Sequence, residues 1–203
     1  DSTAWNPNMG TGCDTILAQM AADCLECDME DIAVYASDTD TAPYDSGSYA
    51  SATTYVTGMA CVRACEELRG KIIRAGAKIL MIDEEAAAFD GKRVYDLQDD
   101  SRTVSLSDIA YSGQCNCNEV LSATVSHSSP VSPPPFMAGA CEVEVDLETG
   151  KVELVDYVAA VDCGTPINPN LARVQTEGGL VQGIGMALYE DIVYAADGTN
   201  LSN

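Results

Sequence analysis

The clearest local signal in the chain is the segment 142–154, which reads EVEVDLETGKVEL. Valine or leucine alternates there with glutamate or aspartate, and this two-residue period is typical of a strand with one apolar and one polar face. Residues 148–151, ETGK, separate the two alternating runs with a turn. We therefore predict a β-hairpin with one solvated face, whose second strand continues to Val161.

Helical patterns lie on both sides of this hairpin. Downstream, Asn168 and Pro169 have the residue types of a helix cap and a first helical position, which predicts a helix extending to about Glu190. Upstream, residues 51–80 carry apolar residues at spacings of three and four, which predicts one long helix. The apolar stripe of this helix consists of Cys61, Cys65, Leu68, Ile72, Ala75 and Ile79.

Shorter elements complete the chain. A first helix, capped by Asp14 or Thr15, is predicted through Cys24. Ser105 is expected to cap a short helix ending at Tyr111. Strands are expected at 32–36, within 90–96 and at 191–194, the last followed by a turn at 197–198.

Helices and strands therefore mix without a regular βαβ rhythm, which favours an α+β fold. We expect one subdomain over 1–135, with the long helix and a Ser/Pro-rich loop, and a second over 136–203. Because the sequence stops where a hairpin would return, we expect the second subdomain to be truncated and the fold to be incomplete on its own. Gly58 and Gly76 lie inside the long helix, so at least one of them should permit close packing.

Composition excludes several classes of protein. The chain has 203 residues, 46% of them hydrophobic, which is enough for a buried core. Its 32 acidic and 10 basic residues give a net charge of −22, which disfavours binding to nucleic acid or to a membrane surface. No membrane-spanning run or secretory signal is visible, so we expect a soluble, cytoplasmic protein.

Nine cysteines do not form a recognisable metal motif. The only metal-like spacing is Cys24 to Cys27, and the single histidine, His127, lies far away in a loop. The count is odd, and the spacing matches neither a disulfide framework nor an iron–sulfur cluster. We therefore expect no metal ligands in this chain and interpret the cysteines as reduced thiols, several of them buried.

Three places combine small residues with a helix start or a helix face. They are the turn 8–12 (NMGTG), the loop 46–51 (SGSYAS) and the stripe of Gln175, Gly179, Gln182 and Met186. The first two place hydroxyls and backbone amides at helix starts, where an anionic ligand binds favourably. In the stripe, neighbouring glycines allow either a crossing helix or a bulky cofactor to lie against the helix. The alternative for the first two places is a purely structural role, in which the turn and the loop only lead into and cap the helices that follow them.

Taken together and in order, these motifs resemble the molybdenum hydroxylases, the xanthine dehydrogenase and aldehyde oxidase family. The resembling segments are 9–12 (MGTG), 38–40 (DTD), 46–51 (SGSYAS), 55–58 (YVTG), 132–136 (SPPPF), 143–146 (VEVD), 162–169 (DCGTPINP), 175–179 (QTEGG), 182–185 (QGIG) and 187–190 (ALYE). They cover nearly the whole chain. The resemblance implies the fold of the family's molybdenum-cofactor-binding domain, with mixed sheets and long helices.

The resemblance also implies a bound molybdopterin cofactor, in a plain or a dinucleotide form. The residues implied to hold it are Gly10, Thr11, Gly12, Ser48, Tyr49, Ala50, Ser51, Thr53 and Gln175. Two positions depart from the family pattern: Thr11 stands where Gln is frequent, and Ala52 where Arg is frequent.

The resemblance further implies the chemistry of the family, which is hydroxylation of an activated C–H carbon. The implied substrate is a purine or another N-heteroaromatic compound, with electrons leaving through 2Fe–2S clusters and FAD on partner subunits. The family's catalytic glutamate lies in a Gly-Glu motif that this chain lacks, so no catalytic residue is implied here and the isolated chain should be inactive. The missing part of the site would come from another molybdenum-subunit polypeptide or from the missing ends of the same chain. The alternatives are a cofactorless scaffold or assembly subunit, and an aldehyde- or CO-type member.

Overall fold

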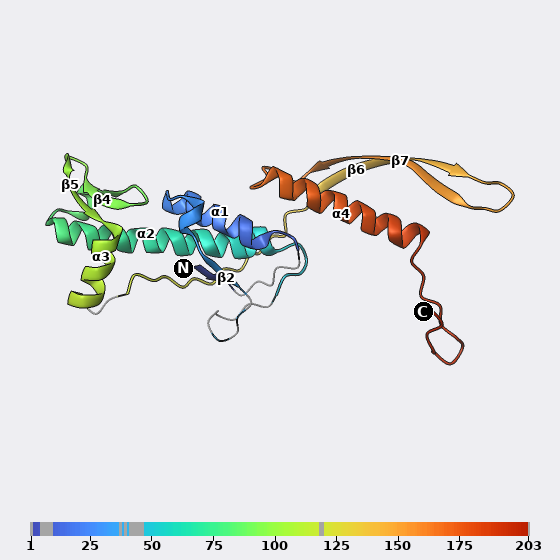
Figure 1. Cartoon of the computed structure of the whole chain (residues 1–203), viewed down its shortest axis with the longest axis horizontal. Helices are drawn as coiled ribbons and strands as arrows, with labels where there is room; N and C mark the ends of the chain where they lie inside the picture. Colours follow the sequence, from blue (N-terminus) through green and yellow to red (C-terminus); the bar gives the residue numbers. More distant parts are fainter. Residues whose placement is uncertain are drawn as a thin grey trace. The chain divides into compact units, whose positions relative to one another are not determined.

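The computed structural model describes residues 2–4, 10–36, 38, 40, 47–117 and 120–202. The chain divides into two compact units, Asp1–Ser132 and Pro133–Asn203 (Figure 1). Helices and strands are mixed in both units, which confirms the α+β class.

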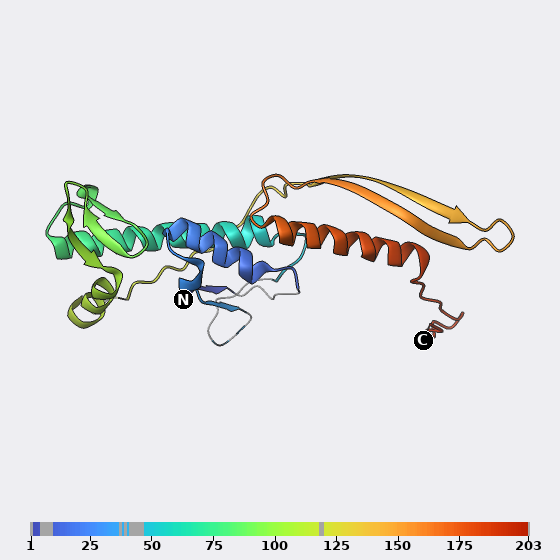
Figure 2. The same cartoon turned by 45° about the horizontal axis from the view of Figure 1, so that its top comes forward.

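Two helices form the frame of the first unit. Helix α1 (Cys13–Leu25) packs along α2 (Gly58–Leu80), and Figures 1 and 2 show both helices side by side. They run in the same direction, because Leu17 of α1 contacts Cys61 of α2 while Glu26, just after α1, binds Arg69 further along α2. Strands β1 (Ser2–Ala4) and β2 (Val34–Ala36) form a short parallel pair.

A small antiparallel sheet packs on the later half of α2. Its order is β3 (Ala87–Phe89), β4 (Arg93–Asp96) and β5 (Asp99–Ser105), and α3 (Leu106–Ser112) follows. The core between sheet and helices consists of Ile72, Ala77, Ala87, Phe89, Val94, Val104 and Ile109. The apolar stripe of α2 therefore has a sheet to pack against.

Short helical segments join these elements. Single helical turns lie at Met29–Asp31 and Glu84–Ala86, and five-residue π-helical segments lie at Thr53–Thr57 and Gly113–Cys117.

The close packing expected at the helix glycines is confirmed. A Cβ atom on Gly58 would lie 2.7 Å from Met20 Cε of α1. A Cβ atom on Gly76 would lie 2.5 Å from the Cβ of Val94, which is fully buried in β4. Both glycines therefore let a neighbouring element approach the backbone of α2.

The predicted stripe of α2 is only partly buried. Cys65 and Ile72 belong to the buried residues, whereas Ile79 is 38% exposed. The sheet meets α2 over Gly76 and Ala77 instead, so the buried face rotates away from Ile79 near the end of the helix.

Of the three predicted helix caps, one is wrong and two are confirmed. Gly12 in a left-handed conformation precedes α1, so the predicted cap by Asp14 or Thr15 is wrong. The Ser105 Oγ atom accepts a hydrogen bond from the Asp108 amide, 3.1 Å away, as expected of a cap. Asn168 Oδ1 accepts one from the Leu171 amide at 3.1 Å, and α4 (Pro169–Leu188) follows it.

The second unit consists of the predicted hairpin and of α4. Strands β6 (Phe136–Val145) and β7 (Val152–Asp162) pair in antiparallel register, with a bulge between the pairs of Glu142 and Val143. The register places apolar residues opposite one another on a single face: Met137 and Val161, Gly139 and Ala159, Cys141 and Tyr157, Val143 and Leu154, and Val145 and Val152. The other face bears five carboxylates, Glu142, Glu144, Glu153, Asp156 and Asp162. The predicted hairpin is therefore confirmed, but both of its faces are exposed in this structure.

The last predicted strand is nearly absent. Around residues 191–194 the structure has a single bridge between Tyr194 and Asn200, which closes the turn at 197–198. Within the described part of the chain, no helix is long and apolar enough to span a bilayer.

Candidate functional site

The parallel course of α1 and α2 brings two of the three predicted places to one end of the first unit. The turn 10–12 immediately precedes α1, and the residues 47–53 lead into α2. Leu17, in the second turn of α1, contacts Cys61 in the first turn of α2, and α1 also contacts the π-helical segment that precedes α2, so the two helix starts lie near each other. We call this end, formed by residues 10–12 and 47–57, the loop end.

The turn before α1 depends on two left-handed glycines. Gly10 has φ +89° and Gly12 has φ +78°, a region that side chains with a Cβ atom rarely adopt. Gly12 O accepts the first helical hydrogen bond from Ile16 N at 3.2 Å. Exposed Thr11 lies between the glycines, and its side chain partly opposes the rise in the pKa of the Cys13 thiol that burial and Asp14 cause. The turn therefore presents one hydroxyl on a defined backbone; Asn8 and Met9 lie outside the described residues.

The loop before α2 contains left-handed residues that are not glycine. Ala50 has φ +54° and Ser51 has φ +56°, and each costs roughly 1–2 kcal/mol relative to a right-handed conformation. Both residues are exposed, and neither backbone amide has a hydrogen-bond partner among the described residues. Backbone strain of this kind concentrates at ligand-binding sites, and amides in such turns form concave sites for anions.

Hydroxyl groups surround these two residues. The Ser48 and Thr53 hydroxyls lie 3.3 Å apart and share a hydrogen bond across the loop. The Tyr49 side chain is 63% exposed, while its carbonyl accepts a hydrogen bond from Ala52 N at 3.2 Å. Thr53 begins the π-helical segment, a distortion that is frequent at functional sites. Sequence reasoning found the residues of this loop but neither its strain nor the π-helical turn, for which Ala50, Ser51 and Thr53 give no sequence signal.

Gln175, the remaining predicted residue, lies in the other unit. It is exposed on α4, and no residue of α4 is buried. A Cβ atom added to Gly178, Gly179 or Gly183 would meet nothing within 4 Å. Within the described residues of the second unit no helix crosses this face, so its glycines are open there.

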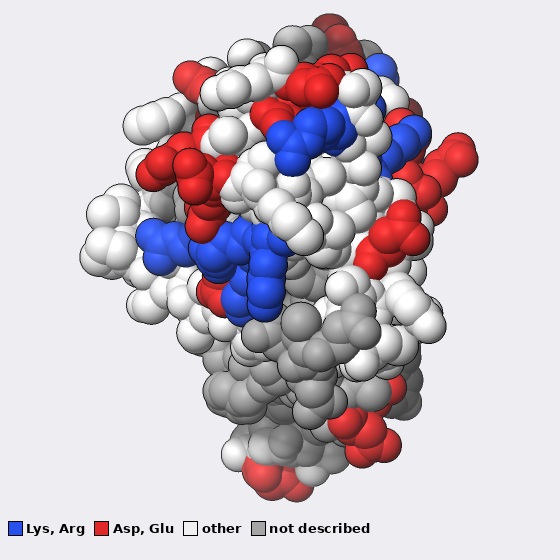
Figure 3. Space-filling model, turned by 90° about the vertical axis from the view of Figure 1, so that its left-hand side faces the viewer, with Lys and Arg blue, Asp and Glu red and all other residues white. Residues whose placement is uncertain are grey.

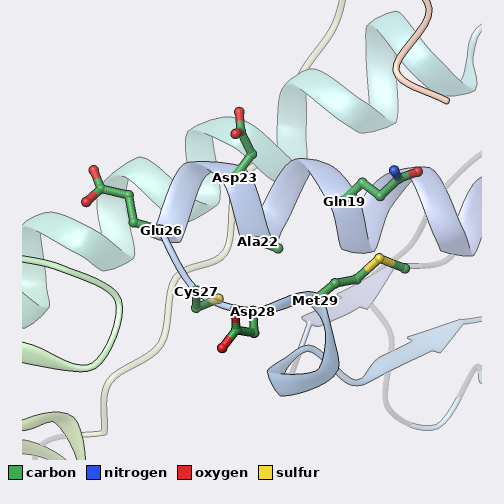
Figure 4. A pocket seen from close by; sticks show the side chains of 7 residues that line it. All are labelled: Gln19, Ala22, Asp23, Glu26, Cys27, Asp28 and Met29. Carbon is green, nitrogen blue, oxygen red and sulfur yellow. The ribbon is translucent and has the colours of Figure 1, made fainter.

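A separate hollow lies at the other end of α1. Figure 4 shows its lining, which is made of Gln19, Ala22, Asp23, Glu26, Cys27, Asp28 and Met29. None of the predicted site residues belongs to it. Arg69 pairs with Glu26 at 2.6 Å and Lys92 with Asp28 at 3.2 Å, so the nearby cations are already held by carboxylates. A lining rich in carboxylates is a poor site for an anionic cofactor.

The cysteines behave as separate thiols. The eight cysteines whose side chains the structure describes are free, and Cys13 and Cys65 are buried. Cys24 and Cys61 lie at the contact of α1 and α2, with Cys24 Sγ 3.7 Å from Val62 O and Cys61 Sγ 3.8 Å from Leu17 O. In the part of the chain that the structure describes, no three Cys, His, Asp or Glu side chains are grouped as metal ligands.

The donor set of the loop end fits a pterin. A pterin ring has both donors and acceptors, and the hydroxyls of Thr11, Ser48, Ser51 and Thr53 can serve as either. The amides of Ala50 and Ser51 add donors for a phosphate. The loop end thus offers neutral hydrogen-bonding groups on a defined backbone.

Comparison with known proteins gives consistent matches over nearly the whole chain. The family model of the molybdopterin cofactor-binding domain matches residues 4–203. The chain is 37% identical over 196 residues to the probable hypoxanthine oxidase XdhD of Escherichia coli strain K12, covering 96% of this chain and 20% of that protein. It is 32% identical over 198 residues to the carbon monoxide dehydrogenase large chain of Hydrogenophaga pseudoflava, covering 96% and 25%.

Its structure is similar to that of quinoline 2-oxidoreductase from Pseudomonas putida 86, with a TM-score of 0.82 at 25% identity, covering 98% of this chain and 26% of that one. The chain therefore spans about a fifth to a quarter of the length of these relatives.

Proposed function

We propose a function from one premise: the chain belongs to the molybdopterin cofactor-binding domain family, within the molybdenum hydroxylases. On this premise, residues 1–203 form part of the molybdenum subunit of an oxidoreductase. The enzyme acts in the cytoplasm on an activated C–H bond of a purine or N-heteroaromatic substrate. The relative named as a probable hypoxanthine oxidase supports this substrate class, whereas the relative named as a carbon monoxide dehydrogenase supports the alternative CO or aldehyde type.

The observation that carries the proposal is the loop end. There, the two glycines around Thr11 and the left-handed pair Ala50–Ser51 hold backbone amides and hydroxyls toward solvent beside two adjacent helix starts. Such strain is retained where binding benefits from a fixed backbone. This strain supports a ligand site at the loop end.

In this proposal, each residue binds or orients the cofactor. Gly10 and Gly12 position Thr11, whose hydroxyl donates to or accepts from the pterin. Ser48, Tyr49, Ala50, Ser51 and Thr53 line the pterin and its phosphate. Gln175, from α4, both donates and accepts through its amide group.

The two units would correspond to the family's two subdomains, expected at 1–135 and 136–203. When bound, the molybdenum cofactor supplies the redox chemistry of the reaction, and 2Fe–2S and FAD partner subunits would take the electrons. No residue of this chain is assigned to proton transfer, so the isolated chain is expected to be inactive. A further molybdenum-subunit polypeptide would complete the site.

Metal and pterin analysis of the protein purified with its partners tests this proposal. Ser51→Tyr should fill the loop end, and Gln175→Ala should remove the amide, so both should lower the molybdenum content. Ser101→Tyr, at an exposed position of β5, and Gln98→Ala, in the exposed turn before it, are the matched controls and should leave the molybdenum content unchanged. Unchanged molybdenum in both folded site variants would contradict the proposed contacts.

A cofactorless scaffold is the second candidate function. Thr11 and Ala52, which stand where Gln and Arg are frequent, are the observations that favour it. In that case the purified complex would contain no molybdenum in any variant.

A further inference from the structure

Two cysteines approach the same turn of α2 from the two helices of the first unit. Cys24, in the last turn of α1, is half-buried, and its Sγ donates a hydrogen bond to Val62 O of α2 at 3.7 Å. Cys65 follows Val62 by three residues and is 7% exposed. Because side chains in a helix lean toward its N-terminus, the Cys65 side chain covers the turn that carries the Val62 carbonyl. The two sulfur atoms therefore lie at one place in the contact of α1 and α2.

Arg69 holds the backbone of Cys24 in this position. It lies one helical turn beyond Cys65, and its Nη1 donates to Cys24 O at 3.3 Å and to Glu26 Oε1 at 2.6 Å. Figure 3 shows the end of the first unit opposite the loop end, where Lys and Arg side chains gather among acidic ones. Polar contacts with Val62 and Arg69 thus fix Cys24 against the part of α2 that bears Cys65.

Small residues let the two helices approach closely. Ala18, Ala21 and Ala22 of α1 are buried, and Gly58 of α2 leaves room for Met20. Helix axes are commonly about 8–10 Å apart, whereas a disulfide requires Cα atoms within about 7 Å. A contact made of such small side chains favours that shorter range.

Each of the two thiols also alters the ionisation of the other. Burial and then the Cys65 thiol raise the pKa of Cys24. The Cys61 thiol and then burial raise the pKa of Cys65, and Cys24 partly opposes that rise. Both groups are therefore mainly protonated near neutral pH, and their reactivity as thiolates should increase as the pH rises.

Other pairings of these cysteines fit a disulfide less well. Cys61 Sγ lies 3.8 Å from Leu17 O, and Leu17 is seven residues, or roughly 10 Å along α1, from Cys24. Cys61 and Cys65 are one turn apart on α2, where Cβ atoms are about 5–6 Å apart, whereas a disulfide needs about 3.5–4.5 Å. Cys24 and Cys65 are thus the better-placed pair.

We infer that Cys24 and Cys65 form a redox-active dithiol, which a small-molecule disulfide oxidises to a disulfide bond between α1 and α2. The bond closes a covalent ring of residues 24–65, which contains residues 47–57 of the loop end. A ring of this kind restricts the unfolded chain and opposes separation of the two helices. Oxidation therefore ties the loop before α2 covalently to α1.

Two thiol–disulfide exchanges form this bond. The Cys24 thiol loses its proton to solvent, and its sulfur attacks one sulfur of the oxidant, RSSR. A bond between Cys24 and SR forms, the S–S bond of the oxidant breaks, and one RS⁻ leaves. The Cys65 thiolate then attacks the Cys24 sulfur and releases the second RS⁻. The dithiol loses two electrons and two protons, and the oxidant is reduced to two RSH.

Peptide mapping of the reduced protein, purified with its partners and treated with oxidised glutathione, tests the inference. Digestion at both basic and acidic residues places Cys24, Cys27, Cys61 and Cys65 in different peptides. The expected product is residues 24–26 joined to residues 64–66, formed faster at about pH 9 than at about pH 7. The same treatment of the unfolded chain, in which every thiol is accessible, is the control for the oxidant.

Two variants separate the pair from its neighbour. Cys65→Ser should leave glutathione bound to Cys24, whereas the matched control Cys61→Ser should retain the bond between Cys24 and Cys65. In the oxidised wild type, hydrogen exchange of the α1 amides should slow by at least about tenfold, because opening of the two helices is opposed. Oxidised Cys65→Ser should show no such slowing.

Two results would overturn the inference, and both are read from the wild type alone. One is a bond from Cys24 to Cys27 or to Cys61 in place of Cys65. The other is that Cys24 and Cys65 both remain free thiols in the folded protein at about pH 9, although the unfolded chain reacts fully.

Discussion

The two units of the molecule reach regular secondary structure in different ways. All apolar residues that the structure shows as buried belong to the first unit, between Cys13 and Ile109. In the second unit, β6, β7 and α4 are well formed, yet none of their residues is buried. The local sequence pattern is thus sufficient to form a hairpin and a helix. A buried core also requires that two elements approach one another closely, as α2 and the small sheet do at Gly76.

The hairpin of the second unit has one apolar face, as is typical of a sheet that packs against another element. Val143 and Val145 on the apolar face of the hairpin are 48% and 45% exposed. A two-stranded hairpin is marginally stable without packing on a hydrophobic face. We therefore expect the stability of the isolated chain to come from the first unit.

The strongest test of this comparison uses the only two phenylalanines. Phe89 is 3% exposed in the core of the first unit, and Phe89→Ala should lower the free energy of unfolding by about 3–5 kcal/mol. Phe136 is 69% exposed, and Phe136→Ala should change it by less than about 0.5 kcal/mol. Urea unfolding of the isolated chain measures both. Equal losses would mean that the hairpin is buried in solution, for example against a second copy.

Substitution of glycines within the helices should change the stability by an intermediate amount. Gly76→Ala would place a Cβ atom 2.5 Å from that of Val94 and should destabilise the first unit by about 1–3 kcal/mol. Gly179→Ala meets nothing within 4 Å, so it should instead stabilise α4 by about 1 kcal/mol through helix propensity.

Thermal unfolding and helix content by circular dichroism check both substitutions. Gly70→Ala, which would make only an ordinary 3.6 Å contact with Arg74, is the control within α2 itself and should not destabilise. A harmless Gly76→Ala would contradict the close approach of β4.

The smallest expected effect is a difference in the rates at which exposed and buried cysteines are alkylated. Cys141 and Cys163 are exposed and should be alkylated first, whereas buried Cys13 should react only on opening of the first unit. Burial raises the pKa of Cys13 and Cys24, so a smaller fraction of each is thiolate near neutral pH, and alkylation of these two should increase only at higher pH.

Mass spectrometry of alkylated peptides over a pH series gives the order of reaction. The purified complex is the informative comparison: protection of Cys141 there would indicate that a partner covers the apolar face of the hairpin. Reaction of Cys13 as fast as Cys141 in the native chain would refute the packing of α1.

Much of the fold could be predicted because its signals are local. The alternation around Val143 and Val145, the caps at Ser105 and Asn168, and the spacing along α2 each depend on residues close in sequence. Strands β3 and β5 were not predicted, because β3 has three residues and β5 buries only Val104 among polar neighbours. Such strands form because β4 and α2 provide the surface, which no local pattern reveals.

For the candidate site too, some features follow from the sequence and others only from the tertiary structure. Sequence alone predicted which residues belong to it, since glycines and hydroxyls before helix starts are visible in the chain, and it determined that residues 1–62 contain no lysine or arginine. Only the tertiary structure decided that the turn at Thr11 and the loop at Ser51 lie at one end, since the parallel packing of α1 and α2 depends on contacts such as that of Leu17 with Cys61. It also decided that Ala50 and Ser51 take left-handed conformations, because the surrounding loop and the π-helical turn, rather than intrinsic preference, hold their backbone there.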